Sequence, residues 1–209
     1  KVRLFSRPNL SILKLNKSYG ISQLKTDWVS YLDPDERIPP DLAGHFKSTL
    51  AETKHNAFRI PRRNHFFGRF LRYGGQYPDY QLRLFRHGKA SFPNRHVHES
   101  LEVEGSIGRL AEPFDHHPYP DLNTYLRKMN FYTSFQAEFW GQEGLIPSRF
   151  RTSRYLFFRP LSRLFRRYVL KMGFRDGWQG YLAALGDAFQ TAVSYGKFLQ
   201  SRTENPPCG

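Results

Sequence analysis

The segment that decides the fold is Trp28-Val29-Ser30-Tyr31-Leu32, which runs directly into Asp33-Pro34-Asp35-Glu36. Its first half is β-branched, aromatic and apolar, and these residue types favour a short buried strand. Its second half combines Asp and Pro, which favour turns and end the strand abruptly. The pattern therefore predicts a strand that carries acids at its C-terminal end, where open α/β sheets place their ligands.

The residues that follow alternate between helix and strand patterns. Pro39-Pro40-Asp41 predicts a helix start, because proline and an acid are favoured in the first turn. Leu42, Phe46 and Leu50 then recur at a spacing of four, as in a helix that packs on a sheet. Further strands are predicted over residues 57–61, 64–73 and 80–86, with a turn at Tyr73-Gly74-Gly75. The mixture predicts an α/β fold.

From Tyr119 onward the pattern becomes helical. Residues 144–175 contain nine Arg or Lys and no acid, and apolar side chains lie between the cations. A last helix is predicted over 178–199. We therefore expect an α/β domain over residues 1–118 and a helical, basic, amphipathic C-terminal region over 119–209.

The composition of the 209-residue chain narrows the class of protein. Its 32 Lys and Arg against 18 Asp and Glu give a net charge of +14, which indicates an anionic partner such as nucleic acid, a membrane surface or a phosphorylated substrate. The single cysteine, Cys208, excludes an intramolecular disulfide framework and favours a reducing compartment. We expect no signal peptide and no apolar run that spans a bilayer.

Asp33 and Asp35 are candidate ligands of a divalent cation. Two carboxylates one residue apart on a turn can hold Mg²⁺ or Mn²⁺ and leave coordination positions for substrate phosphates. The same residues also make a good turn, so a purely structural role stays open. Arg83 is a candidate phosphate ligand, and Arg86 is expected on the same face of its strand, with solvated arginines as the alternative.

We call Asp33–Glu36 the acidic segment. Several other short tracts of sequence follow it along the chain. They are Asn56–Asn64, Gly68-Arg69, Gly74-Gly75, Arg83–Gly88, His96–Glu99, His116–Tyr119, Tyr125–Thr133 and Gly173–Gly177. Together with the acidic segment they resemble family 2 glycosyltransferases, in the bacterial branch typified by lipopolysaccharide inner-core β-glucosyltransferases. The resemblance covers nearly the whole chain. It implies a partial GT-A domain, of the nucleotide-diphospho-sugar transferase type, because two strand-helix units of that domain are expected before this segment.

The resemblance implies a role for each candidate binding residue. Asp35 would bind the metal, Mg²⁺ or Mn²⁺, that bridges the diphosphate of the donor. Asp33 would contact the nucleotide ribose or the metal shell, and Arg83 and His98 would bind the nucleotide-sugar. His116 matches a histidine that returns to the metal or diphosphate, although a hydrogen-bonding loop histidine is the alternative.

Glu99 corresponds, by the same resemblance, to the general base that accepts the proton of the acceptor hydroxyl. Its alternative is a surface acid beside Glu102 and Glu104. Glu36 is expected to orient the acidic loop.

The expected function is an inverting glycosyltransferase that moves a sugar from a nucleotide-sugar donor, UDP-glucose by resemblance, to a lipid-linked or lipopolysaccharide-type saccharide. As an incomplete domain, the chain itself could be an inactive fragment. The enzyme is expected in the cytoplasm, peripherally attached to the inner face of the cell membrane. The alternative is a basic, non-catalytic binding protein for anionic glycolipid or RNA.

Residues 144–175, which we call the basic segment, have three interpretations. An interfacial helix pair would contact an anionic membrane. A nucleic-acid patch would use arginines on phosphates and aromatic rings for stacking, and is the least favoured. In the third interpretation the rings pack on the α/β domain and the arginines are solvated. The expected membrane contacts are Phe157, Phe158, Arg163, Phe165, Arg166 and Arg167.

Overall fold

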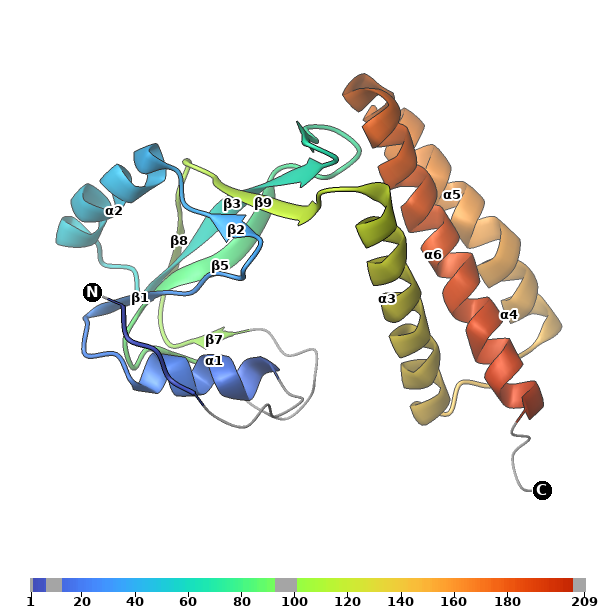
Figure 1. Cartoon of the computed structure of the whole chain (residues 1–209), viewed down its shortest axis with the longest axis horizontal. Coiled ribbons are helices and arrows are strands. Elements are labelled where there is room, and N and C mark those ends of the chain that lie inside the picture. The colour runs from blue at the N-terminus through green and yellow to red at the C-terminus, as the bar shows by residue number, and fades with distance from the viewer. Residues whose placement is uncertain (1, 7–12, 93–100, 205–209) are drawn as a thin grey trace. The chain divides into compact units, whose positions relative to one another are not determined.

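The computed structural model describes residues 2–6, 13–92 and 101–204, which form two compact units (Figure 1). The first unit comprises the described residues up to Arg62 together with Asp79–Asp115, and the second comprises Arg63–Pro78 and the described residues from His116 onward. The second unit thus joins the segment Arg63–Pro78 to the helices that were expected after residue 118. The expected division into domains at residue 118 stays a prediction.

The elements confirm most of the predicted helices and strands. Those up to residue 119 are α1 (Leu13–Ser22), β1 (Trp28–Ser30), β2 (Glu36–Arg37), α2 (Pro40–Glu52), β3 (Ala57–Phe66), β4 (Arg69–Phe70), β5 (Asp79–Arg86), β6 (Ala90–Ser91), β7 (Glu102–Val103), β8 (Ile107–Arg109) and β9 (Phe114–Tyr119). Those that follow are α3 (Leu122–Gln142), α4 (Arg149–Ser153), π-helical η1 (Arg154–Phe158), α5 (Arg159–Phe165), π-helical η2 (Arg166–Leu170), the short 3₁₀-helix η3 (Gly173–Asp176) and α6 (Gly177–Glu204).

The main sheet is mixed, with the strand order β1-β5-β3-β9-β2, and β4 and β8 also pair with β3. β5 is antiparallel to both β1 and β3, whereas β8 runs parallel to β3. The α/β class is therefore confirmed. We expected the acids after β1 to lie at a ligand-binding edge, as they do at the carboxyl ends of parallel strands. β1 is instead the last strand in the order and runs antiparallel to β5, so that rule does not apply to the loop after β1.

The first unit has a hydrophobic core on each face of its sheet. Alternate residues of a strand point to opposite faces, so Leu84 and Phe85 of β5 enter different cores. Leu84 packs with Leu42 of α2, and Phe85 packs with Val29 of β1. Helix α2 begins at Pro40, as predicted, with Asp41 in its first turn. The two cores together hold β1 in place, and with it the loop that follows.

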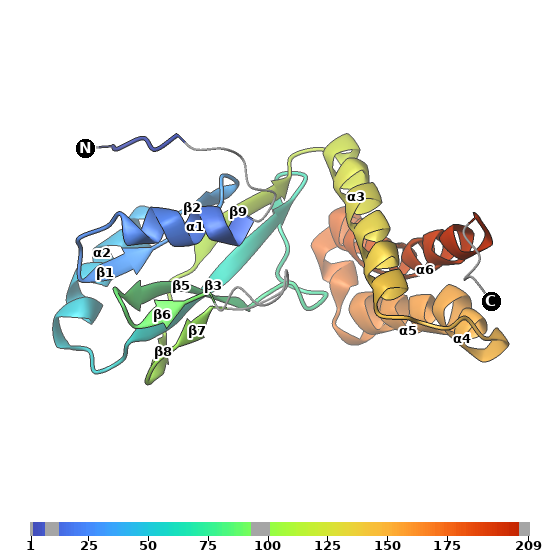
Figure 2. The ribbon, with the colours of Figure 1, turned by 90° about the horizontal axis from the view of Figure 1, so that it is seen from below.

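The second unit is built from three long helical segments that lie side by side (Figures 1 and 2). α6 contacts both α3 and α5. Asp121 caps α3 by accepting a hydrogen bond of 2.7 Å from the Thr124 N–H, which satisfies one of the unpaired donors of the first turn. Of the helices that the structure describes, none is both long and apolar enough to cross a bilayer.

Candidate acidic-loop site

The loop between β1 and β2 is closed by two reciprocal hydrogen bonds. The backbone N–H of Glu36 donates to the Asp33 carbonyl oxygen at 3.0 Å, and the backbone N–H of Asp33 donates to Glu36 Oε2 at 3.0 Å. The Glu36 side chain has no exposed area. Glu36 therefore orients the loop, as expected from the sequence, and holds Asp35 between two fixed points.

Arg83 connects this loop to strand β5. Its Nη2 donates to Glu36 Oε1 at 2.5 Å and to Asp33 Oδ2 at 2.9 Å. The guanidinium also lies 4.5 Å from the centroid of the Tyr31 ring and 5.9 Å from that of Phe114. Burial lowers the pKa of Arg83, but the charges of Tyr31 and Glu36 outweigh burial and raise this pKa above the ordinary value. The cation is thus a permanent part of the loop's support.

Two further cations extend the arrangement into an alternating chain of charges. Lys17 Nζ lies 2.5 Å from Asp33 Oδ1. On the other side, Arg62 Nη1 lies 3.5 Å from Glu36 Oε1, and Arg62 Nη2 lies 2.7 Å from Asp79 Oδ2. The order is Lys17, Asp33, Arg83, Glu36, Arg62 and Asp79, and we call these six residues the charge network. Each internal member has a partner of opposite charge on both sides, which offsets the desolvation of the buried charges.

Asp33 is held as a carboxylate by these contacts. Burial alone would raise the pKa of Asp33, but the hydrogen bonds and charges of Lys17 and Arg83 lower it below its ordinary value. Each of its oxygens accepts from one cation, and each keeps a further lone pair. Asp33 can therefore still accept a hydrogen bond from a hydroxyl group, which is compatible with the predicted ribose contact.

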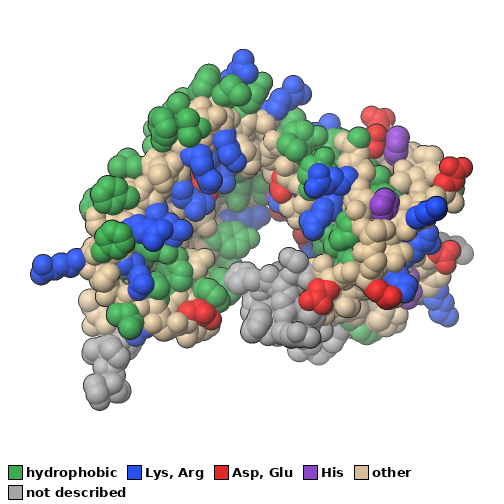
Figure 3. Space-filling view, turned by 180° about the vertical axis from the view of Figure 1, so that it is seen from behind, with side chains coloured by type: hydrophobic (Ala, Val, Ile, Leu, Met, Phe, Trp, Pro, Cys, Tyr) green, Lys and Arg blue, Asp and Glu red, His purple; other side chains and the backbone are tan. Residues whose placement is uncertain are grey.

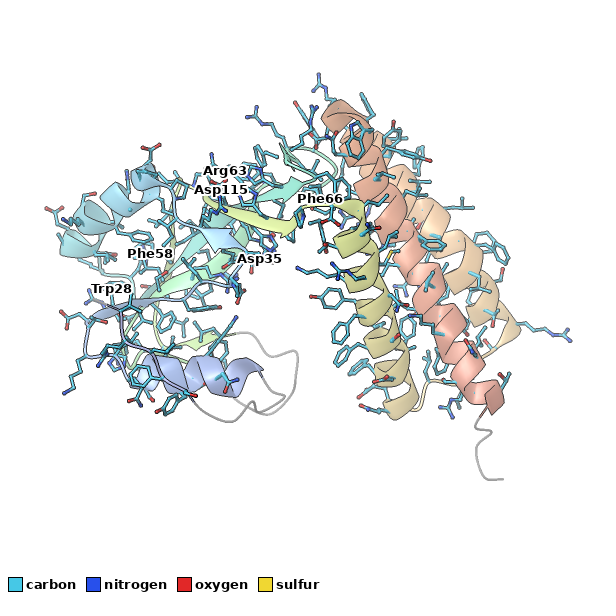
Figure 4. The ribbon with its side chains drawn as sticks, in the orientation of Figure 1. Trp28, Asp35, Phe58, Arg63, Phe66 and Asp115 are labelled. Carbon is cyan, nitrogen blue, oxygen red and sulfur yellow. The ribbon has the colours of Figure 1, made fainter. Side chains whose placement is uncertain are left out.

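Asp35 is half-buried and lies in the loop that follows β1 (Figure 4). Within residues 2–6, 13–92 and 101–204, no three His, Cys, Asp or Glu side chains are grouped so that they could hold a metal ion. Mg²⁺, however, usually takes only one or two carboxylates from the protein and completes its coordination with water and substrate phosphates. The role of Asp35 as a metal ligand stays a prediction.

The expectation that Arg83 and Arg86 share a face of β5 is wrong. They are three positions apart, and side chains along a strand alternate between faces. Arg83 points into the charge network, whereas the Arg86 guanidinium lies 4.7 Å from the Trp28 ring centroid and donates to the Thr53 carbonyl oxygen. Of the two arginines, only Arg83 contacts the acidic loop.

His116 belongs to the second unit, whereas Asp33 and Asp35 belong to the first. Its Nδ1 lies 2.7 Å from Oδ1 of Asn64. The Asn64 Nδ2 donates to the Gln76 carbonyl oxygen at 3.2 Å, so the amide presents its oxygen to His116, and Nδ1 carries the proton that His116 donates to it. A metal-ligating histidine also carries a proton on Nδ1 when Nε2 is the ligand. The metal role of His116 stays a prediction.

His98 and Glu99 lie outside the described residues. Their expected roles, nucleotide-sugar binding and general base, stay predictions.

The basic segment is partly neutralised by an acid from another helix. Asp187 of α6 accepts from Arg163 Nε at 2.8 Å and from Arg163 Nη2 at 2.7 Å, and its Oδ2 lies 2.9 Å from Arg167 Nε. The three expected aromatic contacts, Phe157, Phe158 and Phe165, are all exposed. Arg163 and Arg167 therefore bind α6, while Arg166 and the rings face outward.

A comparison of the chain with models of known protein families finds no match.

Sequence reasoning missed most of the partners in the charge network. Lys17, Arg62 and Asp79 received no role, because each is an ordinary charged residue in its local segment. The one local signal was the position of Glu36, three residues after Asp33, which suits a turn closed by a side chain.

Proposed function

We propose that these residues belong to an inverting glycosyltransferase of the GT-A type, in family 2. The donor is a nucleotide-activated sugar such as UDP-glucose, and the acceptor is a lipid-linked or lipopolysaccharide-type saccharide. The observation that carries the proposal is the acidic loop, which is closed by Asp33 and Glu36 and anchored to β5 by Arg83. A loop supported in this way keeps its carboxylates in place when a charged ligand binds.

Each candidate residue has a separate role in the proposed transfer. Asp35 would hold the divalent cation, Mg²⁺ or Mn²⁺, which neutralises charge on the departing nucleoside diphosphate. Asp33 accepts hydrogen bonds from the ribose hydroxyls, and Lys17 and Arg83 together keep Asp33 ionised and oriented. Glu99 accepts the proton of the acceptor hydroxyl as the oxygen attacks the sugar carbon, and the nucleoside diphosphate leaves.

A transfer assay tests this proposal. The gene product that contains these residues is incubated with UDP-[¹⁴C]glucose, MnCl₂ and lipopolysaccharide, and label in the acceptor is counted. Glu99→Gln and Asp35→Asn should each lower the rate by about 100-fold or more, the size expected when an acid–base group or a metal clamp is lost. Asp41→Asn, in the first turn of α2, is the control and should retain the wild-type rate.

Titration with UDP and Mn²⁺ separates the two roles. Asp35→Asn should weaken binding of the pair, whereas Glu99→Gln should leave it unchanged, because the base acts on the acceptor. Wild-type transfer by both variants, or equal loss of UDP–Mn²⁺ affinity in both, would contradict the assignment.

A further inference from the structure

One side of residues 154–171 exposes apolar side chains at regular intervals. Phe157, Leu161, Phe165 and Val169 recur at every fourth position and are 61%, 65%, 56% and 45% exposed. Residues four apart are neighbours on a helix surface, so these four form one continuous row, which we call the apolar stripe. Exposed apolar patches of this kind mark interaction sites.

The helical hydrogen bonding keeps the apolar stripe straight. η1 and η2 are π-helical, and α5 between them is α-helical. An α-helix has about 3.6 residues per turn, and the longer i→i+5 bonds of a π-helix add to that number, so the average here is about four. Side chains four positions apart therefore stay on one side instead of drifting around the axis.

Cations lie on the same segment as the apolar stripe. Arg154 and Arg166 are exposed and lie three positions before Phe157 and Val169 of the stripe. A shallow groove with a volume of about 440 Å³ is lined by Arg159, Ser162, Arg163, Phe165, Arg166 and Leu170. In Figure 3, which shows the back of the molecule, apolar and basic side chains are interleaved over the helical unit. Guanidinium groups in such a groove present several donors to phosphate oxygens.

Two acids near this segment, Asp187 and Asp176, already have cationic or N–H partners. Residues 144–175 contain no acid. Asp187 is paired with Arg163 and Arg167, and the buried Asp176 accepts backbone N–H groups of the 63–78 segment. The outer side of 154–171 therefore combines an apolar stripe with positive charge.

We propose that this side is a docking surface for an anionic lipid bilayer. The apolar stripe enters the boundary between headgroups and acyl chains, and Arg154 and Arg166, beside the stripe, bind lipid phosphates. A second copy of the chain is a poorer partner, because it would bring the same positive charge to the contact. Nucleic acid would use rings for stacking, but gives no role to the exposed aliphatic Leu161 and Val169. The proposal does not depend on the transferase activity.

Vesicle flotation tests the apolar part. Phe157, Leu161 and Phe165 are replaced together with Ser in the full chain, and binding is measured to phosphatidylcholine vesicles with and without phosphatidylglycerol. Loss of three inserted side chains should weaken binding by roughly 100-fold or more. The matched control replaces Leu122, Leu126 and Phe131 of α3, which are 48%, 45% and 66% exposed, and should bind as wild type does.

The charge part of the proposal is tested by the double variant Arg154→Gln, Arg166→Gln. These cations are exposed, so the variant should fold. At roughly fivefold per cation, binding to vesicles with phosphatidylglycerol should fall by about 30-fold and should depend less steeply on salt. Binding to pure phosphatidylcholine should not change.

A dye reports insertion while the other three residues of the stripe stay in place. Leu161→Cys, in a Cys208→Ser chain labelled with an environment-sensitive fluorophore, should shift to the blue when anionic vesicles are added. Three results would overturn the proposal. They are wild-type flotation of the Ser variant with an unchanged circular dichroism spectrum, displacement of the chain from vesicles by inorganic phosphate alone, and tighter binding of oligo(U) RNA than of vesicles.

Discussion

Glu36 shows how a single buried charge can set the geometry of a functional loop. Its carboxylate receives hydrogen bonds from the Asp33 backbone and from Arg83, and the Arg62 guanidinium lies nearby. Because removing one partner of a buried pair leaves the other charge without compensation, Glu36 contributes more to this loop than a surface acid would. The loop's shape therefore depends on a residue that need not touch the substrate.

We predict that Glu36→Ala lowers the free energy of unfolding of the first unit by about 3–5 kcal/mol. Urea unfolding is followed by Trp28 fluorescence in a chain whose Trp140 and Trp178 are replaced with Phe. Glu52→Ala, at the exposed end of α2, is the control and should stay within about 0.5 kcal/mol of wild type.

Adding Arg83→Met to Glu36→Ala should recover part of the loss, because the buried cation, which then keeps only Asp33 as an anionic partner, is removed. A double variant that is destabilised by the sum of the two single changes would show that the charges do not interact.

At the scale of the element, the ion pairs between α5, η2 and α6 make the second unit sensitive to pH. Burial would raise the pKa of Asp187, but the hydrogen bonds and charges of Arg163 and Arg167 lower it below the ordinary value of 3.8. A carboxyl group whose pKa is lower in the folded state stabilises the fold above its unfolded-state pKa. That contribution is lost as the pH falls through the lower, folded-state value.

We therefore expect Asp187→Asn to destabilise the second unit at pH 6 to 7, roughly the neutral range in which folded proteins are most stable. The difference from wild type should shrink as the pH falls below 3.8, the ordinary pKa of the group. Urea unfolding of both proteins at a series of pH values measures the difference in their free energies of unfolding. A difference that stays constant across the series would contradict the role of the ionised carboxylate.

The glycines of α6 differ in what surrounds them. A Cβ added at Gly180 would lie 2.1 Å from the Gly173 carbonyl oxygen, whereas one added at Gly196 meets nothing within 4 Å. Gly180 therefore permits the close approach of α6 to η3, and Gly196 only loosens the helix.

We predict opposite effects of alanine at these two positions. Gly180→Ala should destabilise the second unit by about 1–3 kcal/mol, the usual cost of overpacking. Gly196→Ala should stabilise it by up to about 1 kcal/mol through helix propensity. Thermal unfolding shows directly whether each substitution stabilises or destabilises the protein. If both substitutions stabilise it, η3 can move away from α6.

At the scale of the whole molecule, the second unit is assembled from two separate stretches of chain. The buried Asp176 accepts the backbone N–H groups of Arg72 and Tyr73 at 3.2 and 2.7 Å. Leu71, which has no exposed area, belongs to the same core cluster as Ala183 of α6. The helices from residue 119 onward thus depend on a segment that precedes β5.

We predict that a fragment of residues 119–209 remains helical but does not unfold cooperatively and binds the dye ANS, because Asp176 and the α6 face lose their partners. The control joins residues 63–78 to 116–209 through a flexible Gly/Ser linker and should restore a cooperative transition. Cooperative unfolding of the shorter fragment, at the midpoint of the longer one, would contradict the role of the 63–78 segment.

Local patterns predicted the elements whose causes are local. The start of α2 at Pro40, strand β5 and the turn at Tyr73 follow from proline geometry, from β-branched and aromatic residues and from glycine. The helical periodicity of α3 and α6 was visible for the same reason, since it depends only on neighbours three and four positions apart. The acidic turn and the orienting role of Glu36 also belong to this group.

The partners of the charged residues were decided by the tertiary structure. Arg83 meets Asp33 and Glu36, 50 and 47 positions away, because β5 lies beside the loop. Counting charges along 144–175 found no compensating acid, yet Asp187 neutralises Arg163 and Arg167 from a neighbouring helix. A one-dimensional pattern records which groups are present, whereas hydrogen bonds and ion pairs act over a few ångströms in space, so only packing determines which charges are paired and which remain exposed.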